Sequence, residues 1–82
     1  MPYETSDTYF AAFLLVAGVP MSGSRLGSED GKVYFSFENP GPHVIRELKH
    51  SYFSGSGVVP ALAFSQNLKH LRQVVSGLRR GA

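Results

Sequence analysis

The 82-residue sequence contains no cysteine. Without thiols the chain can form neither a disulfide framework nor a zinc–thiolate site, it has no thiol nucleophile, and a reducing cytoplasm is its natural compartment. Its first residues lack the basic cluster that opens a secretory signal peptide. The longest apolar run, residues 9–17, is far shorter than the ~20 residues that span a bilayer. We therefore predict a soluble cytoplasmic protein with no membrane partner.

Composition and length indicate one small globular domain. Hydrophobic residues form 43% of the chain and charged residues 17%, which excludes an intrinsically disordered protein. A chain of this size has room for one modest core. We expect a single domain over residues 1–82, with an N-terminal arm at residues 1–5 and a frayed tail at residues 80–82.

Charge is distributed unevenly along the chain. Residues 1–38 contain two basic and five acidic residues, whereas residues 39–82 contain six basic residues and one acidic residue. This polarity predicts an acidic partner for the second half. It is equally compatible with direct attraction between the two halves of the chain.

Residues 6–18 predict a helix at the centre of the fold. Its apolar part contains no polar group other than one tyrosine hydroxyl. Ser6 is a suitable N-cap, Asp7 places negative charge on the first turn, and Gly18 suits the left-handed residue that ends a helix. Because a helix that is apolar on every side must be buried on every side, we expect the other segments to enclose it.

The rest of the chain predicts a β-hairpin and two amphipathic helices, which makes an α+β domain of order α-β-β-α-α. The hairpin has a weak first strand at residues 19–26 and a regular second strand at residues 32–38, apolar on one face. The middle helix covers residues 43 to about 53, and its apolar stripe is Val44, Ile45, Leu48 and Tyr52. After a flexible Ser-Gly link at residues 54–57, the last helix runs from residue 60 to about residue 78. Its stripe is Phe64, Leu68, Leu71, Val75 and Leu78.

Three segments are similar to parts of a known family. They are the Tyr-x-Thr-Ser-Asp-x-Tyr opening at residues 3–9, the Lys-Val-Tyr-Phe-Ser-Phe-Glu strand at residues 32–38, and Asn-Leu-Lys-x-Leu-Arg at residues 67–72. Together they resemble a family of short prokaryotic and mobile-element proteins catalogued as a domain of unknown function. The resemblance implies an apolar helix, a hairpin and two helices over roughly residues 3–75, and it transfers no reaction, ligand or catalytic residue.

A row of polar and basic side chains on the last predicted helix is the best candidate for a binding surface. Each of its first five members follows one residue after a member of the apolar stripe, so the row lies about 100° round the helix from the buried side, and Arg80 extends the charge at the end. We call the following residues the basic row: Ser65, Lys69, Arg72, Ser76, Arg79 and Arg80. Lysine and arginine bind a phosphate backbone by displacing counterions, and serine donates to phosphate oxygens. The alternative is an ordinary solvated face, because the helix dipole favours cations in the last turn.

Other clusters give weaker indications. Tyr34 could stack on a base, or it could cover a core edge or join an interface. His43, Glu47 and His50 share one helix face and could hold a divalent cation, but the same spacing gives ordinary surface pairs. The Ser-Gly link lacks the Lys-Ser/Thr ending of a P-loop, and no histidine–acid pair is placed to activate a serine. We predict no catalytic residue, metal site, cofactor or small-molecule substrate.

Two classes of function remain. The first is a small non-enzymatic binding or adaptor module that contacts a protein partner or a second copy of itself through Tyr34 and Ser36, helped by the open edges of a two-stranded sheet. The second is an accessory protein that binds DNA or RNA through Lys69, Arg72, Ser76, Arg79 and Arg80.

Overall fold

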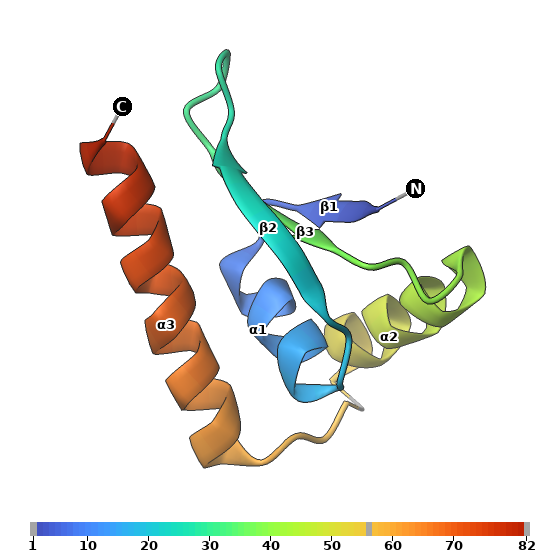
Figure 1. Ribbon diagram of the computed structural model, residues 1–82. Helices are drawn as coiled ribbons and strands as arrows, with labels where there is room; N and C mark the ends of the chain where they lie inside the picture. Colours follow the sequence, from blue (N-terminus) through green and yellow to red (C-terminus); the bar gives the residue numbers. More distant parts are fainter. Residues whose placement is uncertain (1, 56, 82) are drawn as a thin grey trace.

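The computed structural model describes residues 2–55 and 57–81. The element order is β1 (Tyr3–Thr5), α1 (Thr8–Val16), β2 (Met21–Leu26), β3 (Val33–Phe37), α2 (Pro42–Ser54) and α3 (Ala61–Arg80). The three strands form an antiparallel sheet of order β1-β3-β2, and the three helices gather on one side of it (Figure 1). This arrangement confirms the predicted α+β fold. Within the described residues, none of the helices combines the length and hydropathy that a membrane crossing requires.

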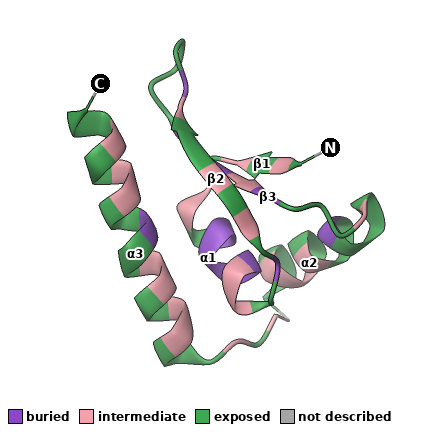
Figure 2. Cartoon of the chain, viewed as in Figure 1, coloured by how far each residue is buried: buried purple, intermediate pink, exposed green. Residues whose placement is uncertain are grey.

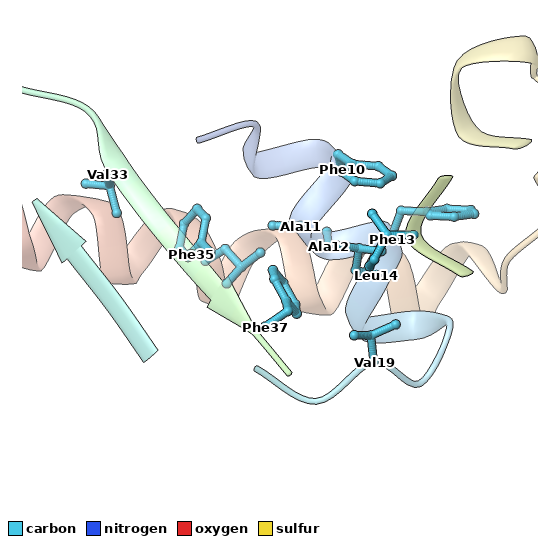
Figure 3. Close-up of a cluster of buried hydrophobic side chains, with 11 residues drawn as sticks. Phe10, Ala11, Ala12, Phe13, Leu14, Val19, Val33, Phe35 and Phe37 are labelled. Atoms are coloured by element: carbon cyan, nitrogen blue, oxygen red, sulfur yellow. The ribbon is translucent and has the colours of Figure 1, made fainter. Parts of the chain in front are cut away.

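The middle of α1 is the centre of the core, as the sequence predicts. Phe10, Phe13 and Leu14 are exposed by only 1%, 5% and 0%. Figure 2 shows buried residues concentrated on α1, and Figure 3 shows Phe35 and Phe37 of β3 beside it. The prediction of burial on every side is wrong at both ends of the apolar run, where the enclosing layers stop. Tyr9 is 47% exposed and Ala17 is also exposed.

Asp7, and not Ser6, caps the start of α1. The Asp7 carboxylate accepts a hydrogen bond from the Phe10 backbone N–H at 3.0 Å. The Asp7 backbone N–H in turn donates to Thr5 Oγ1 at 3.1 Å, which fixes where the chain turns from the sheet into the helix. The helix therefore begins at Thr8, one residue later than a Ser6 cap requires, and Ser6 is left exposed.

Gly18 ends α1 in the way that the sequence predicts. Its φ is +92°, the left-handed region that only glycine adopts without strain. The Gly18 N–H donates to the Leu15 carbonyl at 3.1 Å, and the Val19 N–H donates to the Leu14 carbonyl at 3.0 Å. These two bonds form a Schellman motif, which satisfies the last carbonyls of the helix.

The N-terminal segment is a strand of the sheet, and the prediction of an N-terminal arm is wrong. β1 pairs antiparallel with β3, with Tyr3 opposite Phe37 and Thr5 opposite Phe35. β2 pairs with the other edge of β3, with a register shift between Met21 and Gly23. β3 is thus the central strand and offers no free edge. The sheet has three strands and not the two that the sequence predicts, so its open edges belong to β1 and β2.

Both C-terminal helices pack through most of their predicted stripes. In α2, Ile45 is buried, and the ring centroids of Tyr52 and Phe10 are 5.4 Å apart. Val44 is 38% exposed and does not belong to the stripe. In α3, Leu71 is fully buried and the remaining members of the stripe are half-buried. α3 continues through Arg80, so the frayed tail predicted from residue 80 is helical at its first residue. Residue 56 of the predicted link and residue 82 of the tail lie outside the described residues.

Replacing the cap of α1 tests this account of the fold. We expect Asp7→Ala to lower the free energy of unfolding by about 1 kcal/mol, because the Phe10 N–H loses its acceptor at the start of the central helix. The matched control Ser6→Ala should change it by less than about 0.5 kcal/mol, since Ser6 is exposed. Urea denaturation followed by circular dichroism measures both, and equal losses would contradict the assignment of the cap.

Candidate functional site

The structure brings the basic row together on one exposed side of α3. Lys69, Arg72, Ser76 and Arg79 are all exposed, while the apolar stripe points toward the core. The side of α3 that faces away from α1 is correspondingly exposed along the helix (Figure 2). Arg80 turns back along the helix and donates from Nε to the Ser76 carbonyl at 3.4 Å. The one-residue offset from the stripe therefore places the row from Ser65 to Arg79 on the exposed side of α3, as the sequence predicts.

A shallow groove of about 470 Å³ follows the row from Ser65 to Ser76. The residues that line it are Ser65, Leu68, Lys69, Arg72, Gln73 and Ser76. Leu68 also packs against the core, so the groove combines an apolar contact with cations and hydrogen-bonding groups. Sequence reasoning did not include Gln73, although its spacing of four from Lys69 and three from Ser76 places it on the same side of the helix.

No acidic residue neutralises this surface from within α3. The helix contains no aspartate or glutamate. Among the described residues the two salt bridges are Arg25–Glu4 and His43–Glu47, so none of the cations of α3 is in an ion pair. Neither pair joins residues 1–38 to residues 39–82. In the described part of the chain, the acidic first half and the basic second half therefore do not neutralise each other through direct ion pairs.

Tyr9 extends the surface from a different element. Arg72 donates from Nη2 to the Tyr9 hydroxyl at 2.6 Å, and its guanidinium carbon lies 5.5 Å from the centre of the Tyr9 ring. Sequence reasoning missed this residue because it begins the apolar run that predicts burial. The available signal was its hydroxyl, the single polar group of that run, which favours a place at the boundary with solvent.

The second predicted interface, Tyr34 and Ser36, lies on the face of the sheet opposite the helices. There the Tyr34 hydroxyl donates to the Asp30 carboxylate, and the guanidinium carbon of Arg25 lies 4.6 Å from the Tyr34 ring centre. Ser36 donates to Glu4 Oε2 at 2.9 Å, and Arg25 donates to both oxygens of Glu4 at 3.1 and 3.0 Å. The polar groups of both predicted interface residues are thus engaged within the chain. Arg25 also lies over one face of the Tyr34 ring.

These hydrogen bonds shift the acid–base properties of the outer sheet face. Hydrogen bonds from Arg25 and then Ser36 hold the pKa of the Glu4 carboxyl below its usual value. The Tyr34 hydroxyl, followed by the Lys32 backbone N–H, lowers the pKa of Asp30. The same bond to Asp30 raises the pKa of Tyr34. At neutral pH the Glu4 and Asp30 carboxylates are therefore charged, and the Tyr34 hydroxyl keeps the proton that it donates.

The histidine face of α2 is only partly assembled. His43 Nε2 lies 3.1 Å from Glu47 Oε1, and both side chains are well exposed. His50 is exposed and makes no ion pair with them in the described part of the chain. No group of three or more potential metal ligands occurs among residues 2–55 and 57–81.

Comparisons of the chain with protein-family models, with curated proteins and with solved structures find no match. The resemblance to a family of unknown function accordingly stays a prediction. The functional assignment depends on the chemistry of the surface.

The ion pair of the outer sheet face predicts a pH-dependent stability. Folding lowers the pKa of Glu4, so its stabilising contribution is present above the unfolded pKa of about 4.5 and is lost as the pH falls through the lower folded pKa. We expect Glu4→Gln to be less stable than the parent chain at pH 7, and the difference to shrink below pH 4.5. Urea denaturation at several pH values between 7 and 3 measures this difference. Glu38→Gln, an exposed carboxyl just after β3, serves as the control and should show a smaller difference at pH 7.

Proposed function

We propose that this protein is a small non-enzymatic module that binds nucleic acid through the basic row of α3. One observation carries the proposal. The row is an exposed line of cations on a helix without acidic residues, and none of these cations is in an ion pair among the described residues.

Unpaired cations on a rigid helix favour a polyanion. Each such cation that meets a phosphate releases condensed counterions, whereas a cation already paired with a carboxylate must first give up its partner. From Lys69 to Arg80 the helix rises by roughly 16 Å, which is the length of about five nucleotides along one strand of B-DNA. Ser76 and the amide of Gln73 add hydrogen-bond donors along the same line.

Charge reversal on α3 tests the proposal. We expect a labelled 20-nucleotide strand to bind the parent chain at low salt, with a slope of log K against log salt of about −3 for four phosphate contacts. Lys69→Glu combined with Arg72→Glu should weaken binding at least about tenfold, because two attractive contacts become repulsive. Fluorescence anisotropy between 50 and 200 mM salt provides both quantities.

The matched control makes an equal change in net charge on a different helix. Arg46→Glu combined with Lys49→Glu places two reversals on the exposed side of α2. This variant should retain most of the affinity if α3 is the contact surface. Equal losses in the two double variants would indicate a response to net charge alone, and absence of binding by the parent chain at 50 mM salt would exclude the proposal.

The outer sheet face supports a second candidate, a contact with a protein partner or a second copy. The helices leave this face uncovered, and Tyr34 and Ser36 are half-buried on its central strand (Figure 1). We place it second because a partner would have to desolvate the Glu4–Arg25 ion pair, which is costly.

Sedimentation equilibrium tests this second candidate. A self-associating protein would show a mass that rises with concentration, and Tyr34→Arg should return it to the mass of one chain. Tyr34→Phe is the control, because it keeps the ring beside Arg25 and removes only the bond to Asp30. A mass that does not change with concentration would exclude self-association.

A further inference from the structure

Tyr9 is an exposed aromatic ring beside the groove of α3. It is 47% exposed, in contrast to the buried residues that follow it in α1. Figure 1 shows the start of α1 lying beside the middle of α3, and the hydrogen bond between Tyr9 and Arg72 joins the two helices there. The ring is therefore placed at the boundary between the core and the basic surface.

Arg72 connects the Tyr9 ring to the groove. Its side chain lines the groove together with Lys69, and the same side chain contacts the ring and hydroxyl of Tyr9. The Tyr9 hydroxyl acts as the acceptor, so it orients the Arg72 guanidinium, while Tyr9 itself stays 47% exposed. The guanidinium lies over one face of the Tyr9 ring, so the exposed remainder of the ring is the surface on which a base can stack.

From this juxtaposition we infer that the nucleic acid bound by α3 is single-stranded, and that Tyr9 is the platform on which one of its bases stacks. The inference rests on the proposed function. In a duplex the faces of the bases are covered by their neighbours, and a protein meets mainly phosphates and base edges. In a single strand the faces are available, and a cationic groove bordered by an aromatic ring contacts phosphate and base together. The basic row supplies the first contact and Tyr9 supplies the second.

Binding of two probes by tyrosine variants tests the inference. The probes are a 20-nucleotide oligothymidylate and its duplex with oligoadenylate, both followed by fluorescence anisotropy. We expect the single strand to bind more tightly than the duplex. Tyr9→Leu should weaken single-strand binding about tenfold, as loss of one stacked base predicts, and should leave duplex binding within about twofold.

Tyr9→Phe separates stacking from the orientation of Arg72. This variant keeps the ring and removes the hydroxyl, so it should bind the single strand nearly as well as the parent chain. Because the chain contains no tryptophan, its tyrosine emission can be followed directly. Single-strand binding should quench this emission in the parent chain, and less so in Tyr9→Phe although that variant still binds. Phe53→Leu, at an aromatic residue that is 62% exposed on α2, is the control and should bind as the parent chain does.

The outcomes distinguish the inference from the proposal on which it rests. Equal binding of both probes, unchanged by Tyr9→Leu but lost on Lys69→Glu with Arg72→Glu, would overturn the inference and leave the proposed function standing. Equal weakening by Tyr9→Phe and Tyr9→Leu would assign the effect to the hydroxyl that holds Arg72, which also overturns the stacking role. Absence of binding to either probe at low salt would overturn both.

Discussion

Burial of the middle of α1 is the constraint on which the rest of the structure depends. Five consecutive residues of this helix, from Phe10 to Leu14, are buried, so material must cover the helix on several sides. The apolar face of β3 covers one side, Tyr52 of α2 packs on Phe10 and Phe13, and α3 lies along another side with Leu71 fully buried. The orientation of α3 is set by this contact, because its apolar stripe must point inward. The basic row then points outward.

The sequence was informative where a periodic pattern is long and was uninformative where a contact joins distant segments. The apolar run of α1, the alternation of β3 and the stripe of α3 all predict the elements that form. β1 is only three residues long, so it carries no pattern of its own, and its pairing with β3 is a tertiary event. The cap of α1 follows from the same pairing. Ser6 and Asp7 are both good caps, and the position at which the chain leaves β1 decides between them.

The candidate site was likewise predictable where its residues lie on one helix, and not where they meet from different elements. The offset from the apolar stripe places the basic row correctly because both lie on one helix. Tyr9 and Arg72 are 63 positions apart, and no pattern in the sequence indicates that they meet. Ser36 likewise binds Glu4 across 32 positions, which engages a side chain that the sequence leaves available for a partner. Contacts between side chains of different elements therefore depend on the tertiary structure and leave no pattern in the sequence.

The strand order also determines how the sheet can grow. With β3 in the centre, another chain could add a strand only beside β1 or β2. β1 offers three residues as a template, and β2 is interrupted by the irregular register between Met21 and Gly23. Short or bulged outer strands are a common protection against edge-to-edge aggregation. The most regular and most aromatic strand of the protein is thereby kept away from the edges at which fibrous assemblies begin.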